Sequence, residues 1–274
     1  MGAPPRPGVA DIDSVNRGTW NLPATIRACE RLQDWSDPGE QAAIEYVAQE
    51  VNWRPILDIG VGAGRTTTIL RTISRKYIGI DYTREMVDVC RARHPGARIV
   101  QMDARDLRDL QRDQFALVMF SMYGIDSVGY ADRLKVLAEV NRVLQPNGLF
   151  VFSALNRDGP ACGQTPGLHF EFSWNSIRHA WRTLLRPRQL LRSVSNYRGN
   201  RALIESHDDW AIMNCADHDF GLVAMYTTLA EQKRQLDAAG FDTELVLDNV
   251  KGQPVADGAD TRAARWLHYV ARKR

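Results

Sequence analysis

The sequence predicts a doubly wound α/β fold, in which helices cover both faces of a parallel sheet and the chain makes one long insertion. Five short apolar runs between residues 56 and 154 alternate with segments of helical periodicity, and the connections are short. This alternation is typical of a parallel sheet. The runs are continuously apolar, as expected of strands that are buried on both sides. The pattern breaks after residue 156 and returns at Thr228, which indicates the insertion.

The first helix of the core is predicted to begin at Asp37. Asp37 can cap the helix, Pro38 suits its first position, and Glu40 can complete a capping box. The apolar residues that follow lie at helical spacing and form one stripe. They are Ile44, Val47, Ala48 and Val51.

The remaining elements follow in order, each delimited by turn or cap residues. Strands are predicted over residues 56–59, 77–80, 97–101, 115–120, 149–154, 242–247 and 267–271, and helices from Thr66, over 83–94, over 131–144 and over 228–239. The chain thereby divides into three parts. Residues 1–18, rich in Pro, Gly and charge, are predicted to be a mobile tail. Residues 19–156 and 226–274 are predicted to form the core, and residues 157–225 an inserted cap.

Composition restricts the classes of partner and compartment. The formal net charge is +2 at pH 7 over 274 residues, which disfavours nucleic acid as a partner. The four cysteines are scattered without a CxxC pair, so neither a zinc site nor a disulfide framework is expected, and a cytoplasmic setting is favoured. There is no run of 18 apolar residues and no apolar N-terminal segment, so we predict neither a membrane span nor a secretory signal.

A glycine-rich turn with the sequence DIGVGAGR follows the first strand, over residues 58–65. Glycines let a ligand approach the backbone, and the free N–H groups that open the next helix favour a carboxylate. The dinucleotide fingerprint has a glycine where this chain has Arg65, and Asp58 can bind an ammonium group, directly or through water. The turn therefore favours a nucleoside that carries an amino acid. Its predicted contacts are Asp58, Gly60, Gly62, Gly64 and Arg65.

Two further carboxylates follow the next two strands. Asp81 is at the tip of the second strand, where it can accept hydrogen bonds from both ribose hydroxyls. Asp103 follows the third strand and can accept from an adenine amino group. Tyr82 and Met86 are expected to flank the purine ring.

These motifs resemble those of the class I S-adenosylmethionine-dependent methyltransferases, over about residues 40 to 155. The matching segments are Asp58–Gly64 for the first motif, Gly79–Asp81 for the ribose-binding strand, Asp103–Ala104 for the adenine-contacting turn, Phe120–Gly124 for the fourth motif, Arg142–Gly148 for the entry to the fifth strand, and Thr228–Phe241 for the late helix.

The resemblance implies a seven-stranded, mostly parallel sheet whose last strand is antiparallel, and S-adenosylmethionine as the cofactor. It also implies that Ala104 contacts the adenine, that Phe120 lies beside the methyl group, and that the cap binds the methyl acceptor. The family's enzymes that methylate amino groups of nucleic-acid bases usually carry prolines in the fourth motif. Residues 121–124 contain none, which disfavours that class.

The predicted cap is rich in arginine and aromatic residues. Ile177, Trp181 and Leu184 share one face of a predicted helix, and Arg178 and Arg182 share another. The pattern is typical of a solvated basic face over a small aromatic core. It also fits an acidic or carrier-bound acceptor, and both interpretations are kept.

Three side chains are candidate general bases: His218, His169 and Asp126. His218 stands next to Asp219, and a histidine near a carboxylate can act as a base. Asp126 follows the fourth motif and could reach the methyl group. A structural role is the alternative for each of the three.

The sequence thus predicts a cytoplasmic S-adenosylmethionine-dependent methyltransferase that acts on a small molecule, and on an oxygen rather than a nitrogen. An RNA- or protein-directed methyltransferase that uses the arginine-rich cap is the first alternative. A non-catalytic protein that binds S-adenosylmethionine and a partner is the second.

Overall fold

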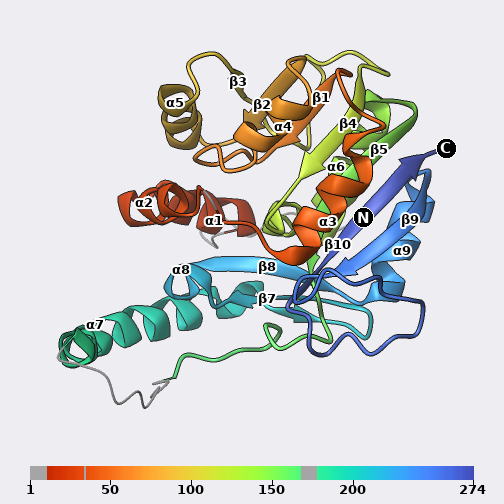
Figure 1. The fold of residues 1–274 in the computed structure, drawn as a ribbon. Coiled ribbons are helices and arrows are strands. Elements are labelled where there is room, and N and C mark those ends of the chain that lie inside the picture. Colours follow the sequence, from red (N-terminus) through yellow and green to blue (C-terminus); the bar gives the residue numbers. More distant parts are fainter. Residues whose placement is uncertain (1–10, 34, 168–177) are drawn as a thin grey trace.

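The computed structural model describes residues 11–33, 35–167 and 178–274. Its main sheet has seven strands in the order β3-β2-β1-β4-β5-β10-β9 (Figure 1). β10 runs antiparallel to both of its neighbours, whereas β1 to β5 pair in parallel. The predicted seven-stranded, mostly parallel sheet is therefore confirmed. The strands are β1 (Ile56–Ile59), β2 (Tyr77–Asp81), β3 (Arg98–Gln101), β4 (Phe115–Phe120), β5 (Leu144–Leu155), β9 (Phe241–Asp248) and β10 (Trp266–Lys273).

Helices cover both faces of this sheet. Alternate residues of each strand point to opposite faces, and each face packs against its helices in a separate hydrophobic core. In β4, Val118 belongs to the core under one face and Leu117 to the core under the other. α3, α4 and α5 contribute to the second of these cores, and α6 and α9 to the first. The bounds are α3 (Pro38–Ala48), α4 (Thr67–Ile73), α5 (Arg84–Arg93), α6 (Tyr130–Val143) and α9 (Leu229–Ala238).

The segment predicted as a cap contains a small antiparallel sheet and a long helix, which lie below the main sheet in Figure 1. The small sheet has the strand order β6-β7-β8, and β8 continues two residues beyond the predicted end of the cap at residue 225. The elements are α7 (Arg178–Gly199), η2 (Asn200–Leu203), β6 (Glu205–Ser206), β7 (Trp210–Cys215), α8 (Asp217–Phe220) and β8 (Leu222–Thr227).

The predicted mobile tail is wrong for residues 12–18, because they belong to the helix α1 (Ile12–Trp20). Asp11 caps α1 by accepting a hydrogen bond from the Ser14 N–H at 2.7 Å. Asn16 is buried and holds β8 with both ends of its amide, donating to the Val223 carbonyl at 2.8 Å and accepting from the Val223 N–H at 2.9 Å. The side chains that α1 buries are polar, so no apolar stripe marks the helix in the sequence.

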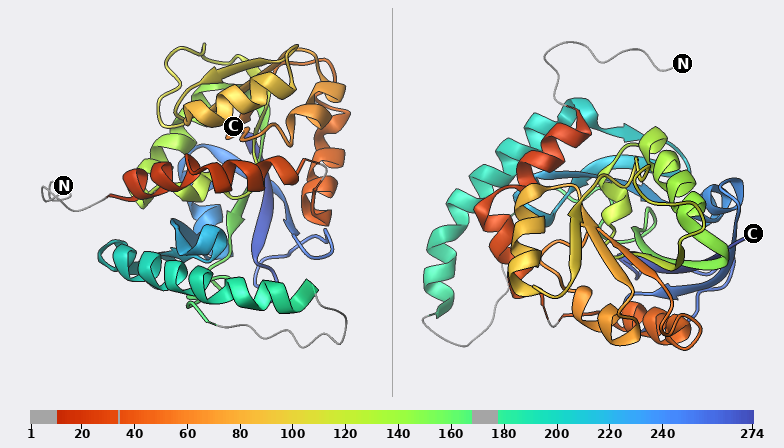
Figure 2. Two further views of the ribbon diagram at one scale, coloured as in Figure 1. Left: turned by 90° about the vertical axis from the view of Figure 1, so that its left-hand side faces the viewer. Right: turned by 90° about the horizontal axis from the view of Figure 1, so that it is seen from above.

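A second helix, α2 (Pro23–Arg31), follows directly. Both views of Figure 2 and the view of Figure 1 agree that α1 and α2 lie between α5 and the cap helix α7. The N-terminal helices therefore connect the core with the cap. No helix within the described residues is long and apolar enough to cross a lipid bilayer.

Candidate active site

A cavity of about 540 Å³ opens at the carboxyl ends of the parallel strands. The glycine-rich turn after β1 and the loops after β2, β3 and β4 line it, and α1 and α2 close it from outside. Parallel sheets bind their ligands at this edge, because the strand ends and helix starts meet there. The cavity wall includes most of the predicted cofactor residues: Gly60, Gly62, Arg65, Asp81, Tyr82, Met86, Asp103, Ala104 and Phe120.

The glycines of the turn are required by geometry at two positions. Gly60 has φ +66°, and a Cβ there would meet the Phe120 ring at 2.8 Å. Gly62 has φ +52°, and a Cβ there would meet nothing within 4 Å. Gly62 therefore leaves its backbone open to the cavity, where a ligand can approach closely.

Asp58 and Gly64 do not line the cavity. Asp58 is buried beneath the turn, where its Oδ2 accepts hydrogen bonds from the Thr66 and Tyr77 hydroxyls, both at 2.7 Å. Burial raises the pKa of Asp58 to about 6. Asp58 therefore holds the turn from below, and its predicted contact with an ammonium group would have to pass through water. Gly64 packs against the His94 ring.

Asp81 lines the cavity at the tip of β2, as the sequence places it. Its Oδ2 accepts from the Gly62 N–H at 3.0 Å, and its Oδ1 accepts from the backbone and the hydroxyl of Thr83, both at 2.9 Å. Burial raises its pKa, and these hydrogen bonds act against that shift. The carboxylate is fixed in orientation. Oδ2 keeps one lone-pair site for a ligand, whereas Thr83 occupies both sites of Oδ1.

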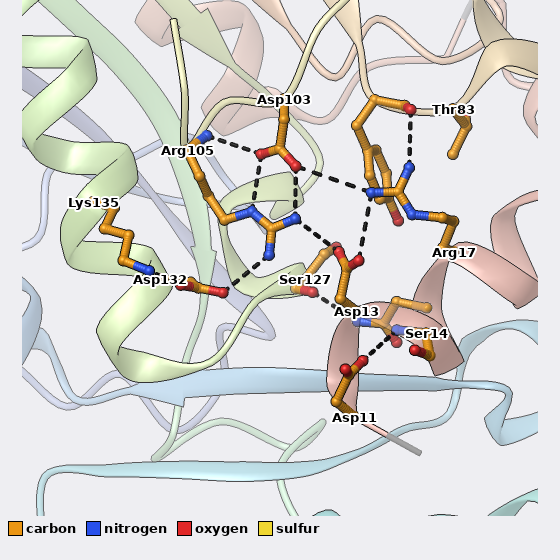
Figure 3. Close-up of polar contacts among 12 residues, drawn as sticks. Asp11, Asp13, Ser14, Arg17, Thr83, Asp103, Arg105, Ser127, Asp132 and Lys135 are labelled. Carbon is orange, nitrogen blue, oxygen red and sulfur yellow. Dashed lines mark hydrogen bonds and ion pairs between the residues drawn. The ribbon is translucent and has the colours of Figure 1, made fainter. Parts of the chain in front are cut away.

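At the end of the cavity that the sequence predicts to hold the adenine, Asp103 belongs to an ionic network (Figure 3). Arg105 donates to both Asp103 oxygens, at 2.9 and 2.6 Å, and pairs with Asp132 of α6 at 2.9 Å and with Asp13 of α1 at 3.0 Å. Burial alone would raise the pKa of Asp103, but the hydrogen bonds from Arg105 hold it below its usual value. The sequence did not indicate this network, which ties α1 to the adenine end.

Tyr82, predicted to flank the purine, is itself covered by α1. The Arg17 guanidinium lies 4.3 Å from the centre of the Tyr82 ring, and it donates to the Tyr82 carbonyl at 3.1 Å. The Tyr82 hydroxyl is buried and has no hydrogen-bond partner within the described residues. An incoming polar group could satisfy it.

Replacing Arg105 with glutamine should loosen α1, because Arg105 is the link between Asp13 and the loop after β3. Amide hydrogen exchange within residues 12–20 should speed up, while exchange in α9, which Arg105 does not contact, should stay unchanged. Arg108→Gln is the matched control, because Arg108 is largely exposed and pairs with Asp106, two residues away. Equal exchange in α1 for both variants and the wild type would refute a role of the network in holding the helix.

Arg65 ends the glycine turn, directly before the N-cap residue Thr66 of α4, and its guanidinium is already engaged. It makes a bidentate ion pair with the buried Glu40 and donates a hydrogen bond to the Ser121 hydroxyl at 2.7 Å. It also lies 5.8 Å from the centre of the Trp35 ring. Arg65 thereby joins α3, the glycine turn and the loop after β4 at one point of the cavity wall.

The other end of the cavity lies on the opposite side of β1, towards β4 and β10. The Tyr123 hydroxyl donates to Asp217 of α8, and Arg265 pairs with the same carboxylate at 2.9 Å. The ring of Trp266 lies 5.4 Å from that of Tyr123, centre to centre. Burial alone would raise the pKa of Asp217, but the nearby Arg265 keeps it lowered, so this carboxylate is charged at neutral pH.

His218 lines the same end of the cavity. Its ring meets the Trp20 ring edge-on at 5.2 Å, and burial lowers its pKa. His218, Asp219 and Phe220 form a left-handed turn, with φ of +53°, +59° and +58°. Such a conformation costs about 1–2 kcal/mol for each residue that is not glycine, and strain of this kind is concentrated at functional sites.

The other two candidate bases stand differently. His169 lies outside the described residues. The prediction that Asp126 reaches the cavity as a base is wrong. Asp126 is fully buried, pairs with the fully buried Arg133, and accepts a hydrogen bond from the Leu155 N–H at 2.6 Å. Its position in the 3-10 helix η1 (Gly124–Ser127) after β4 directs it into the core rather than into the cavity. The position of Asp126 in the sequence does not indicate in which direction its side chain points.

Asp126→Asn should lower stability and leave the cavity intact. The change leaves the Arg133 guanidinium without its carboxylate, and loss of a hydrogen bond to a charged group costs about 2 kcal/mol. For a chain of this size the melting temperature should fall by about 4–8 °C. Affinity for S-adenosylhomocysteine, measured by calorimetry well below that temperature, should not change. A large loss of affinity with an unchanged melting temperature would restore Asp126 to the site.

Several cavity residues were not predicted: Asp13, Trp20, Cys29, Leu32, Trp35, Asp217, Arg265 and Trp266. Five of them lie in α1, in α2 and in the segment between α2 and α3. The segment over residues 11–32 carries two signals that could have revealed its helices: Asp11, which caps α1, and Pro23, the first residue of α2. Asp217 adjoins a predicted base, but nothing in the sequence brings Arg265 next to it.

Comparison with known proteins relates part of the chain to a methyltransferase family. Residues 57–152 match the methyltransferase domain family. A probable S-adenosylmethionine-dependent methyltransferase from Mycolicibacterium smegmatis is 27% identical over 117 residues, which are 43% of this chain and 44% of that protein. A ubiquinone biosynthesis O-methyltransferase from Actinobacillus pleuropneumoniae is 27% identical over 125 residues, 42% of this chain and 52% of that protein. The matched region thus spans about half the length of these curated relatives.

Solved structures share the fold over most of the chain. An S-adenosylmethionine-dependent methyltransferase from Mesorhizobium loti superposes with a TM-score of 0.55 at 20% identity, over 84% of this chain and 98% of that one. A Burkholderia thailandensis 1,6-didemethyltoxoflavin-N1-methyltransferase, crystallised with that compound and S-adenosylhomocysteine, gives a TM-score of 0.59 at 13% identity, over 100% and 93%. Residues 57–152 therefore match a methyltransferase domain, and the chain has the Rossmann-like fold of the class I S-adenosylmethionine-dependent methyltransferases.

Proposed function

We propose that this protein binds S-adenosylmethionine and transfers its methyl group to a hydroxyl oxygen of a small-molecule acceptor. The observation that carries the proposal is the single cavity with two chemically different ends. One end has the carboxylates, open backbone and buried hydroxyl that suit an amino-acid-bearing nucleoside. The other has aromatic walls, an ion pair and a histidine. A volume of about 540 Å³ lies within the range of about 300–1,000 Å³ that is usual for small-ligand pockets.

The residues present fit the cofactor. Asp81 would accept from the ribose hydroxyls, Gly62 leaves room for close approach of the methionyl part, and Tyr82 has a buried hydroxyl that lacks a partner. Asp103 keeps acceptor capacity for the adenine amino group beside Arg105. When bound, S-adenosylmethionine supplies an electrophilic methyl group on a positively charged sulfur. The enclosing helices α1 and α2 would keep water from that centre.

His218 is the proposed base. A neutral hydroxyl is a poor nucleophile, so removal of its proton assists transfer. Burial lowers the pKa of His218, and the ring is therefore neutral at pH 7 and able to accept a proton at one nitrogen. Both adjacent carboxylates are engaged elsewhere, Asp217 with Arg265 and Asp219 with Gln189 at 2.7 Å. The protonated ring would nevertheless be stabilised by their charges.

The names of the similar proteins indicate different methyl-accepting atoms. The Actinobacillus pleuropneumoniae relative is named as an O-methyltransferase, whereas the Burkholderia thailandensis protein is named as an N1-methyltransferase. We favour oxygen because an amine acceptor needs only to be neutral, whereas the buried neutral histidine offers what a hydroxyl requires. The aromatic rings of Trp20, Tyr123 and Trp266 favour a planar acceptor.

The experiment is a transfer assay with S-adenosylmethionine against three acceptor sets: planar phenols, planar amines, and macromolecules comprising RNA and an unmodified protein extract. Formation of S-adenosylhomocysteine reports turnover, and fragmentation mass spectrometry locates the added methyl group. Turnover with phenols and an O-methyl product is expected. An N-methyl product would contradict the proposed transfer to oxygen and indicate a nitrogen acceptor. Turnover with RNA or protein alone would contradict a small-molecule acceptor.

A further inference from the structure

The left-handed turn that carries His218 is held from two sides by elements outside the core. On the α1 side, the Thr19 hydroxyl donates to the Gly221 carbonyl. A Cβ at Gly221 would meet the His218 carbonyl at 2.9 Å and the Thr19 hydroxyl at 3.0 Å, so the turn and α1 are in close contact. The α1 side therefore fixes the end of the turn.

On the cap side, α7 and η2 hold the turn through its backbone and through Asp219. The Asn196 side chain donates to the Asp219 carbonyl at 2.9 Å, and the buried Asn200 donates to the Phe220 carbonyl at 3.2 Å. Gln189 donates to the Asp219 carboxylate at 2.7 Å, and Arg192 lies 3.7 Å from it. Every residue of the left-handed segment after His218 is thus bound by the cap.

Three consecutive residues with positive φ, none of them glycine, persist only where the surroundings impose the conformation. Two backbone carbonyls of the turn face amide donors from the cap, and these donors lie on one helix and the short segment that follows it. If the donors are removed, the chain can relax towards ordinary φ values. Relaxation would rotate the His218 ring away from Trp20 and out of the cavity.

We infer that Asn196 of α7 is a positioning residue for His218: its amide holds the left-handed turn that presents the His218 ring to the acceptor end of the cavity. This role rests on the proposed use of His218 in methyl transfer. The cap thus acts on the reaction through α8, in addition to any contact that it makes with the acceptor. Asn200 supports the same turn but also bonds Asn214 of β7 at 2.9 Å, so Asn196 is the cleaner position to change.

The test follows the His218 ring by NMR titration in the wild type and in Asn196→Ala, with His218→Gln used to assign the signal. Burial lowers the pKa of His218 in the intact turn. In Asn196→Ala the pKa should move up towards the ordinary value of about 6.5, because the ring becomes exposed. Methyl transfer should fall roughly 10–100-fold through kcat, since misplacement of a reacting group is costly.

Ser195→Ala is the matched control, because Ser195 is the exposed neighbour on the same helix. It should leave the His218 titration unchanged. Gln189→Ala is the second test variant. Gln189 is exposed, so we expect the variant to fold, and it should shift the titration in the same direction by a smaller amount. If Asn196→Ala does not fold, Gln189→Ala decides.

An unchanged His218 titration in a folded Asn196→Ala protein would overturn the inference, and so would an equal shift in Ser195→Ala. Calorimetry with S-adenosylhomocysteine separates this outcome from failure of the proposed function. Wild-type protein that does not bind S-adenosylhomocysteine refutes the proposed function, whatever the titration shows. Normal binding in both proteins with an unshifted His218 refutes only the role of Asn196.

Discussion

Replacing Asp81 with alanine is expected to weaken binding of S-adenosylhomocysteine about a hundredfold or more. The carboxylate lines the cavity: Oδ2 has a free lone-pair site for one ribose hydroxyl, and the second hydroxyl would replace the Thr83 hydroxyl at Oδ1. Hydrogen bonds to a charged group contribute about 1.5–3 kcal/mol each, so loss of two costs about 3 kcal/mol or more, and each 1.4 kcal/mol is a factor of ten. Isothermal titration calorimetry measures the effect directly.

Two further variants separate the contact with the ligand from the support of the loop. Asp81→Asn keeps the shape of the side chain and its acceptor oxygen towards Gly62 or Thr83, and it should show an intermediate loss. Glu85→Ala removes an exposed carboxylate in the first turn of α5 and should bind as the wild type does. Wild-type affinity in a folded Asp81→Ala protein would remove Asp81 from the cofactor site.

Replacing His218 with glutamine should lower the rate of methyl transfer roughly 10²–10⁴-fold, the usual contribution of a general base. Affinity for S-adenosylhomocysteine should be retained, because the ring lies at the acceptor end of the cavity. The base acts in its neutral form, so the wild-type rate should rise with pH through the pKa of His218. Burial lowers that pKa, which places the rise below about pH 6.5. The variant should lose this step in its pH–rate profile.

His207→Gln is the control for this prediction, since His207 is an exposed histidine elsewhere in the cap and stacks on Trp210 at 4.0 Å. It should turn over as the wild type does. Rates must be measured where chemistry limits turnover. A His218→Gln protein with the wild-type rate and pH profile would mean that the acceptor arrives deprotonated or that positioning alone suffices.

The cofactor half of the cavity could be predicted from the sequence because it is built from local signals. Gly60, Gly62 and Asp103 follow a strand within a few residues, and Asp81 is the last residue of one. Parallel strands bring such positions to one edge of the sheet, so their mutual proximity follows once the strands are identified. The fold could be predicted for the same reason, since continuous apolar runs and capped helices alternate regularly through the core.

The acceptor half could not be predicted, because long-range contacts assemble it. Arg265 meets Asp217 across 48 positions of sequence, and Tyr123 meets Asp217 across 94. For Asp126 the error is the opposite one. It lies next to the fourth motif in the sequence and was therefore predicted to reach the cavity, but its side chain points into the core. The helix α1 was missed because it buries Asn16 and Thr19 rather than an apolar stripe.

A crystal structure of the protein with S-adenosylhomocysteine tests the central claim most directly. The account predicts the ligand in the 540 Å³ cavity, with both ribose hydroxyls within hydrogen-bond distance of Asp81. It also predicts that the sulfur faces the end lined by Tyr123 and His218. Binding elsewhere, or in this cavity with the ribose away from Asp81 and the sulfur turned from His218, would contradict it.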